Sequence, residues 1–313
     1  MNIGIDMMGG DYAPLEAVKG VQQYLASSDN NLFCIGEETQ LKELFQRHGI
    51  SSPFLHIVPA TEVIGYHEHP TKALKEKPNS SIAIGFKLLV TGEIDAFLSA
   101  GNTGAMLVGA MFSIKTIKGV LRPTIATLLP KLNGKTGLLV DVGLNADCKP
   151  EQLNQFGILG NLYAKHILNI DNPTVGLLNV GEEEGKGNIL AQATYPLLKE
   201  NTAIKFIGNI EGRDVFNDKA DVIVCDGFTG NIILKTAEAM YDAAKHQNLE
   251  NDSFFGRFHF ENYGGTPVLG VNKPVIIGHG ISNAKAFFNM ILLAEKMIQT
   301  RFCEIITSNF ENL

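Results

Sequence analysis

The sequence contains no long hydrophobic run. No stretch of about 18 consecutive apolar residues occurs, and that is the length a membrane-spanning helix requires. The first residues, Met1–Asp6, also lack a basic region followed by an apolar one. We therefore expect neither a spanning helix nor a signal peptide, and we expect the cytoplasm as the location.

Positive charge and cysteine are both scarce. The chain has 26 Lys and Arg against 33 Asp and Glu, a net charge of −7. Nucleic-acid binding needs a basic face, so we expect no nucleic-acid partner. The four cysteines are widely spaced and form no C-x-x-C pair, which predicts reduced thiols; they are Cys34, Cys148, Cys225 and Cys303.

Several catalytic motifs are also missing. The sequence has no G-x-S-x-G nucleophile elbow, no Walker A loop and no H-E-x-x-H pair. A dinucleotide fingerprint does not open the first β-α unit, where Asp6-Met7-Met8-Gly9-Gly10 stands instead. His67-Glu68-His69 is a weak metal signal in an expected loop. We therefore expect no metal and no cofactor, and a mechanism based on positioning and electrostatic stabilisation.

What the sequence does contain is an alternation of short β-branched runs with amphipathic segments, in a globular chain of 313 residues that are 45% hydrophobic. We expect strands at Ile3–Asp6, Asn31–Ile35, Leu55–Val58, Asp95–Ser99, Thr124–Leu129, Gly137–Asp141, Thr174–Asn179, Ile204–Ile207, Asp221–Cys225 and Val275–Ile277. Helices are expected at Pro14–Ser27, Thr39–His48, Ser80–Thr91, Thr103–Phe112, Pro150–Leu168, Asn188–Lys199, Gly230–Lys245 and Asn283–Thr300. This alternation predicts a three-layer α/β/α fold with a mostly parallel sheet.

One domain over residues 1–313 is expected, with a short variable excursion at about 246–262. The stretch Gln247–Tyr263 is polar but carries four phenylalanines, Phe254, Phe255, Phe258 and Phe260. Charged residues interrupt them, so a partner surface and a half-buried loop both remain open.

Glycine-rich polar loops follow many of the expected strands. They include Asp6–Asp11, Ser99–Gly104, Asp141–Asn145, Asn179–Gly181, Asp226–Asn231 and Gly278–Asn283. The carboxyl ends of parallel strands share one edge of a sheet, so we expect these loops to converge there. Glycine permits close backbone approach and helix N-termini attract anions, which predicts a phosphate site. The candidate phosphate-binding residues are Asp6, Gly9, Gly10, Asp11, Gly101, Asn102, Thr103, Gly104, Asn145, Arg213, Asp226, Thr229, Gly230, Ser282 and Asn283.

Four residues are candidates for catalysis, namely Lys186, Asn188, Asn231 and His279. Lys186 lies between two glycines at an expected helix start and can reach an anion, although pairing with the preceding glutamates is the structural alternative. Arg213 can hold phosphate through its planar guanidinium or form a structural Arg-Asp turn. His279, between two glycines after an apolar strand, is the best-placed histidine for proton transfer.

The chain resembles the bacterial phosphate acyltransferases of phospholipid synthesis. The blocks that carry the resemblance run in order along the chain: Gly4–Pro14, Ser99–Ala105, Ile117–Gly119 with Arg122-Pro123, Asp141–Pro150, Asn179–Asn188, Glu211–Asp214, Asp226–Asn231, Tyr263–Pro267 and Gly278–Ala284.

This resemblance implies a fold like that of isocitrate dehydrogenases and phosphotransacetylases, and a homodimer. It implies the reversible transfer of a long-chain fatty acyl group from acyl carrier protein to inorganic phosphate. The acyl phosphate formed would feed a membrane glycerol-3-phosphate acyltransferase. The excursion is shorter and less basic here than in the family, so peripheral attachment to the membrane stays open.

The mechanism we expect is direct attack of phosphate on the thioester, with Lys186 and Arg213 holding the phosphate and Asn188, Asn231 or His279 as donors. Acyl carrier protein is acidic, so docking needs a local basic patch, for which Lys115, Lys118 and Arg122 are the candidates. Two alternatives remain: a short-chain phosphotransacetylase that uses CoA, and a non-catalytic module that binds acyl carrier protein.

Overall fold

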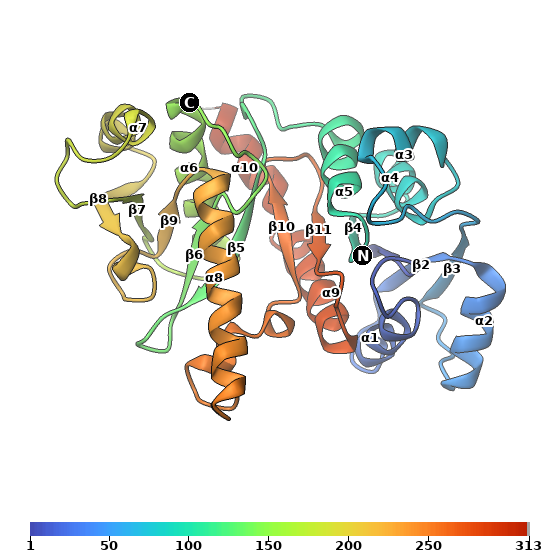
Figure 1. The fold of residues 1–313 in the computed structure, drawn as a ribbon. Helices are drawn as coiled ribbons and strands as arrows, with labels where there is room; N and C mark the ends of the chain where they lie inside the picture. Colours follow the sequence, from blue (N-terminus) through green and yellow to red (C-terminus); the bar gives the residue numbers. More distant parts are fainter. Residues whose placement is uncertain (312–313) are drawn as a thin grey trace. The chain divides into compact units, whose positions relative to one another are not determined.

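The computed structural model describes residues 1–311. They form two compact units (Figure 1). Unit 1 comprises Met1–Ile117 and Phe260–Cys303, and unit 2 comprises Lys118–His259 and the chain from Glu304 onward. The expectation of a single domain over residues 1–313 stays a prediction.

Unit 1 is built on a mostly parallel sheet with the strand order β3-β2-β1-β4-β11-β10. Within residues 1–311, the neighbouring strands of this unit pair in parallel, except for β10 and β11, which are antiparallel. Its elements are β1 (Asn2–Asp6), α1 (Leu15–Leu25), β2 (Asn31–Gly36), α2 (Glu38–Arg47), β3 (Leu55–Pro59), α3 (Pro70–Glu76), α4 (Ser81–Thr91), β4 (Ala96–Ser99), α5 (Thr103–Gly109), the π-helical turn η1 (Ala110–Ile114), η4 (Phe260–Asn262), β10 (Gly265–Leu269), β11 (Val275–Gly278) and α9 (Ala284–Gln299).

Unit 2 has the strand order β5-β6-β9-β7-β8, with β5 and β6 antiparallel and the other pairs parallel. Its elements are β5 (Thr124–Pro130), β6 (Thr136–Val140), α6 (Pro150–His166), β7 (Thr174–Asn179), α7 (Ile189–Glu200), β8 (Lys205–Glu211), η2 (Gly212–Asp214), β9 (Val222–Val224), α8 (Gly227–His246), η3 (Phe255–Phe258) and most of α10 (Phe302–Glu311).

The predicted α/β fold with a mostly parallel sheet is confirmed, and all the predicted strands and helices are present within a few residues of their expected bounds. Besides the short 3-10 turns η2, η3 and η4, one strand and two helices were not predicted. The strand β10 begins at Gly265, directly after Gly264, and contains Pro267, and these residues are typical of a loop. The helix α3 is a short segment after His69, and α10 follows Arg301, whose positive φ of 52° separates it from α9.

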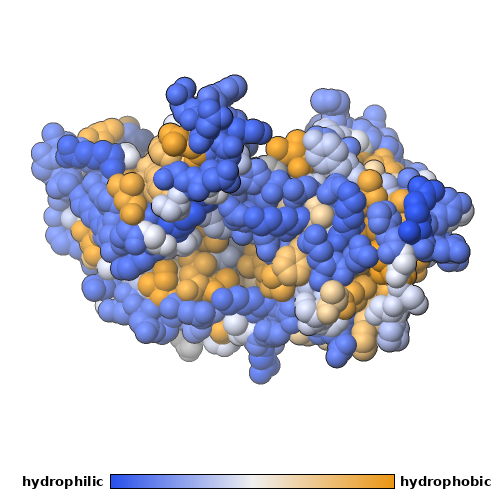
Figure 2. Space-filling model, turned by 90° about the horizontal axis from the view of Figure 1, so that it is seen from below, coloured by the Kyte–Doolittle hydropathy of each residue, from blue (hydrophilic) through white to orange (hydrophobic). Residues whose placement is uncertain are grey.

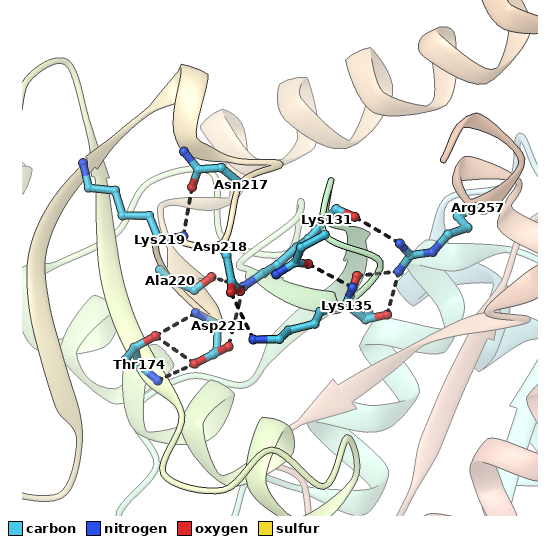
Figure 3. Close-up of polar contacts among 11 residues, drawn as sticks. Lys131, Lys135, Thr174, Asn217, Asp218, Lys219, Ala220, Asp221 and Arg257 are labelled. Atoms are coloured by element: carbon cyan, nitrogen blue, oxygen red, sulfur yellow. Dashed lines mark hydrogen bonds and ion pairs between the residues drawn. The ribbon is translucent and has the colours of Figure 1, made fainter. Parts of the chain in front are cut away.

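The part of the excursion that belongs to unit 2, up to His259, packs within that unit through its aromatic rings. The rings of Phe254 and Phe258 lie 6.5 and 5.2 Å from that of Phe216, in edge-to-face geometry. The guanidinium of Arg257 donates to the carbonyl of Lys131 at 3.1 Å and to the hydroxyl of Thr136 at 3.2 Å (Figure 3). These contacts favour the half-buried loop over a free partner surface.

A buried lysine holds the hairpin between β5 and β6 in place. Lys131 is only 1% exposed, and its ammonium group donates to the carbonyl of Ala220 at 2.6 Å. Asp218 and Asp221 lie 3.5 and 3.6 Å from the same nitrogen (Figure 3). A buried ammonium group needs such partners, so this cluster has a structural role.

Hydrophobic residues also reach the surface. Figure 2 shows them in separate patches among hydrophilic residues on the face seen from below. None of the helices within residues 1–311 combines the length and the apolar character that crossing a membrane demands.

Candidate functional site

Three of the predicted glycine loops meet within unit 1: residues 6–11, 99–104 and 278–283. A Cβ atom added at Gly9 would lie 2.5 Å from the backbone nitrogen of Gly101, so the first two loops touch backbone to backbone. The N–H of Asp11 donates to the carbonyl of Gly280 at 2.7 Å, which joins the third loop. Gly10 permits this approach with a φ of +112°.

Asp6 organises these loops from inside the fold. Its carboxylate is 1% exposed and accepts hydrogen bonds from the N–H of Met8 at 2.9 Å and from the hydroxyl of Ser99 at 2.6 Å. The Ser99 oxygen in turn accepts from the N–H of Gly101 at 2.9 Å. Burial raises the pKa of the Asp6 carboxyl, although these hydrogen bonds oppose the shift. In this structure Asp6 therefore supports the loops.

Asn102 is likewise committed to the fold. It is 4% exposed, and its side-chain oxygen caps α5 by accepting from the N–H of Ala105 at 2.9 Å. Its NH2 group donates to the carbonyls of Gly65 at 2.8 Å and Tyr66 at 3.3 Å. Of the two residues that follow, Thr103 is exposed in the first turn of α5, whereas Gly104 lies against Pro70.

The segment 65–69 contains the weak metal signal His67-Glu68-His69. The carboxylate of Glu68 lies 2.6 Å from the ammonium group of Lys77 and accepts from the N–H of Gly65 at 2.6 Å. The hydrogen bond from Lys77 lowers the pKa of Glu68. Tyr66 donates to the carbonyl of Ala100 at 3.2 Å, and burial raises its pKa to about 12. This loop thus braces the site loops of unit 1.

The N-terminus of α9 already holds a carboxylate. The side chain of Asn283 caps the helix by accepting from the N–H of Ala286 at 3.0 Å, and Glu16 accepts from the N–H of Ala284 at 2.8 Å. Ser282 is 1% exposed, and its N–H donates to the carbonyl of His279 at 3.0 Å. The negative charge of Glu16 disfavours the binding of phosphate at the start of α9. His279, in the turn that Ser282 closes, is half-buried.

In unit 2, the predicted loop at Asp141–Asn145 packs against the start of α8. Asp141 accepts from the backbone N–H of Asn145 at 2.7 Å and from its side-chain NH2 group at 2.8 Å. The carbonyl of Asn145 accepts from the N–H of Gly227 at 2.7 Å. A Cβ atom at Gly230 would lie only 1.8 Å from the carbonyl oxygen of Asp141, so Gly230 is required by packing.

The first turn of α8 is capped by Asp226. Its carboxylate accepts from the N–H of Thr229 and from the hydroxyl of the same residue, both at 2.8 Å. Asn231, one residue after Gly230, is exposed, and its side-chain oxygen lies 3.4 Å from the Cβ position of Gly143. Asn231 therefore stands at the surface beside the loop that Asp141 organises.

A pocket of about 320 Å³ lies in unit 2, at the carboxyl ends of β7 and β9. It brings together three predicted site residues, Asn188, Asp226 and Thr229. The side-chain oxygen of Asn188 accepts from the N–H of Ala191 at 2.8 Å and so caps α7. The other lining residues, most of them apolar, are Leu153, Leu177, Leu178, Asn179, Val180, Leu190, Ala191, Gly212, Cys225 and Ile233.

Asn179 also lines the pocket. It is part of the predicted loop Asn179–Gly181 but is not among the predicted site residues. Its NH2 group donates to the carbonyl of Lys186 at 3.1 Å, and its oxygen accepts from the N–H of Val180 at 2.8 Å. It thereby closes the loop of residues 181–187 next to the pocket. The signal was available, because Asn179 ends a strand two residues before Gly181.

The two predicted phosphate-binding cations face carboxylates in this structure. Lys186 is exposed and lies 3.7 Å from Glu183, and the exposed Arg213 pairs with Glu211. The carboxylates of Glu182, Glu211 and Asp214 approach one another within 4.8 Å. Lys219 pairs with both Glu182 and Asp214, so cations already balance this acidic group.

Three of the cysteines, Cys34, Cys148 and Cys225, are not activated. All four are free thiols. Burial raises the pKa of the thiols of Cys34 and Cys225, and that of Cys148 to about 12. Only a thiolate is strongly nucleophilic, so these thiols are poor candidates for carrying an acyl group.

The three predicted docking cations are exposed but lie on irregular chain. Lys115, with a φ of +67°, follows the π-helical turn η1 in unit 1. Lys118 and Arg122 belong to the stretch before β5 in unit 2. The patch that they were predicted to form stays a prediction.

Residues 1–305 match a family model described as "Fatty acid synthesis protein". A phosphate acyltransferase from Dictyoglomus turgidum is 42% identical, over 96% of this chain and 94% of that protein. One from Thermoanaerobacterium thermosaccharolyticum is 44% identical, over 96% and 93%. The chain belongs to the phosphate acyltransferase family. It is therefore an acyltransferase, as its sequence predicted.

Solved structures place the fold among the phosphotransacetylases. A phosphotransacetylase from Streptococcus pyogenes superposes with a TM-score of 0.69 and 17% identity, over 96% of this chain and 94% of that one. A branched-chain phosphotransacylase from Enterococcus faecalis V583 gives a TM-score of 0.61 at 15% identity, over 95% and 99%. At such identities the likeness concerns the fold alone, and it confirms the predicted phosphotransacetylase-like fold.

Proposed function

We propose that this chain reversibly transfers a long-chain fatty acyl group from acyl carrier protein to inorganic phosphate, forming an acyl phosphate. The relatives named phosphate acyltransferase and the family description support the reaction class. The carrier protein and the chain length are the parts that this proposal adds.

One observation carries the proposal: an apolar pocket and the polar starts of α7 and α8 occur together. Asn188 caps α7, Asp226 and Thr229 form the first turn of α8, and all three line the same pocket. The N-terminus of α7, whose cap Asn188 is neutral, favours an anion, and an aliphatic wall favours a hydrocarbon chain. A fatty acyl phosphate combines these two properties in one molecule.

In the proposed mechanism a phosphate oxygen attacks the thioester carbonyl carbon. The C–O bond forms, the C–S bond breaks, and the departing thiolate of the carrier takes up the proton that the attacking hydrogen phosphate gives up. Lys186 and Arg213 hold the phosphate, and Asn188, Asn231 or His279 donates to the developing oxyanion or to the leaving thiolate. Lys186 must exchange Glu183 for phosphate, which costs little because exposed ion pairs are weak.

The remaining partners follow from the same proposal. The acidic carrier docks on Lys115, Lys118 and Arg122, the enzyme acts as a homodimer, and its product passes to a membrane glycerol-3-phosphate acyltransferase. The enzyme works in the cytoplasm and can meet the membrane only at its periphery.

The test compares three acyl donors at equal concentration with phosphate: palmitoyl-carrier protein, palmitoyl-CoA and acetyl-CoA. The proposal predicts the highest kcat/KM for the palmitoyl-carrier protein. A preference for acetyl-CoA would instead identify a short-chain phosphotransacetylase. Binding of the carrier without turnover of any donor would identify a non-catalytic module.

A further inference from the structure

We propose that the apolar wall of the unit 2 pocket binds the hydrocarbon chain of the acyl donor, with the thioester at its polar edge. The wall comprises Leu153, Leu177, Leu178, Leu190, Ala191 and Ile233. This inference rests on the proposed function and adds to it the place where the chain is held.

The wall draws on α6, α7, α8 and β7, elements that already belong to the core of unit 2. Leu153 is 2% exposed, Leu177 1% and Ala191 8%. Leu190 and Ile233 are half-buried at the outer part. The buried residues hold the shape of the pocket, and Leu190 and Ile233 present its accessible aliphatic surface to a hydrocarbon chain.

Large exposed apolar side chains lie beside the polar edge of the pocket. Val180, which lines the pocket, is 79% exposed. Ile189 follows the cap residue Asn188 and is 89% exposed, and Phe228 stands between Asp226 and Thr229 and is 64% exposed. Such side chains contribute little to the core, and their position suits contact with an apolar ligand that enters the pocket.

The chemistry of the wall favours the acyl chain over the pantetheine arm of the carrier. A pantetheine arm has amide and hydroxyl groups, and burying them without partners is unfavourable. The six wall side chains are aliphatic and offer no hydrogen bond, whereas Asn179, Asn188, Asp226 and Thr229, which also line the pocket, carry polar groups. The arm and the thioester therefore belong at the edge and the hydrocarbon inside.

The chain contains no tryptophan, so a single introduced tryptophan reports on the pocket alone. Ile233→Trp puts the indole in the wall. Ile232→Trp, one residue earlier on α8 and 50% exposed, is the matched control outside the pocket lining. The probe is dibromostearate, a fatty acid whose mid-chain bromines quench tryptophan fluorescence on contact.

The inference predicts saturable loss of fluorescence in Ile233→Trp, reversed by unbrominated palmitate, and no saturable loss in Ile232→Trp. The added ring should also lower kcat/KM for palmitoyl donors relative to octanoyl donors, by about tenfold or more. Absent or equal quenching in the two variants would overturn the inference. If Ile233→Trp does not fold, Leu190→Trp approaches the same wall from α7 and takes its place.

The two proposals fail in different ways. Phosphate-dependent turnover of palmitoyl-carrier protein without pocket quenching would reject the acyl-chain site and leave the function in place. Pocket quenching without any turnover would reject the function and identify a fatty-acid-binding pocket.

Discussion

The side-chain oxygen of Asn188 accepts a hydrogen bond from the N–H of Ala191 at 2.8 Å, at the edge of the unit 2 pocket. Among the described residues, the NH2 group of Asn188 has no hydrogen-bond acceptor. One end of the side chain thus caps α7, while the other is available to a substrate oxygen.

These two roles can be separated by substitution. Asn188→Ser keeps a capping oxygen but loses the amide NH2 group, whereas Asn188→Ala loses both. If the NH2 group donates to the oxyanion, both variants should lose about 10²–10³-fold in kcat. Only Asn188→Ala should also lose stability, by about 1 kcal/mol. Steady-state kinetics and thermal melting check this, and near-normal kcat in Asn188→Ser would exclude the donor role.

Lys186 is predicted to bind phosphate, although its ammonium group is paired with the carboxylate of Glu183 in this structure. Lys186→Ala should raise KM for phosphate by about tenfold, since a charge-assisted hydrogen bond is lost. Stability should hardly change, because the ion pair is exposed. Lys199→Ala is the control, since Lys199 is also exposed and pairs with Glu184 at 2.9 Å. An unchanged phosphate dependence in Lys186→Ala would contradict the assignment.

The buried carboxyl of Asp6 should make stability depend on pH. Burial raises its pKa in the folded chain, so the folded state keeps its proton to a higher pH than the unfolded state does. Stability from this group is therefore complete below the unfolded pKa of about 4 and declines as the pH rises through the folded pKa. The melting temperature of Asp6→Asn relative to wild type should increase over that window. Asp29→Asn controls for the loss of a carboxylate at an exposed position. A flat difference for Asp6→Asn would refute the prediction.

The docking patch can be tested by charge reversal. Lys115→Glu, Lys118→Glu and Arg122→Glu should each raise KM for palmitoyl-carrier protein by about tenfold, because the carrier is acidic. The same variants should leave KM for palmitoyl-CoA nearly unchanged. Lys42→Glu on α2 controls for net charge. Equal effects on both donors would remove these residues from carrier recognition.

Gly230 is expected to matter through packing. Gly230→Ala would place a methyl group 1.8 Å from the carbonyl oxygen of Asp141. We expect Tm to fall by about 2–10 °C, since overpacking costs about 1–3 kcal/mol. Gly185→Ala, where nothing lies within 4 Å, should leave Tm unchanged. A stable Gly230→Ala variant that lacks activity would instead support a direct role in phosphate binding.

Most of the fold could be predicted because hydrophobic periodicity marks buried strands and helices directly. The start of α8 shows the limit: Asp226–Gly230 reads as a loop because of its two glycines, yet the helix begins at Gly227, where the Asp226 carboxylate caps it. The strand β10 was missed because pairing with β11 overrides the poor strand propensity of Pro267 and its glycine neighbours.

The site was harder to predict because capping and ligand binding use the same residue types in the same place. Asn102, Asn188, Asp226 and Asn283 all precede helices, and all four place a side-chain oxygen on a backbone N–H of the first turn. The apolar pocket left no local signal. Its wall comes from separate elements, whose leucines and isoleucines look like ordinary core residues in the sequence.

The most direct test of the account incubates the purified protein with palmitoyl-carrier protein, with and without phosphate. Free carrier thiol is measured together with acyl phosphate trapped by hydroxylamine. The account predicts thiol release only with phosphate, and an equal amount of palmitoyl hydroxamate. Thiol release without hydroxamate, or no phosphate-dependent release at all, would contradict it.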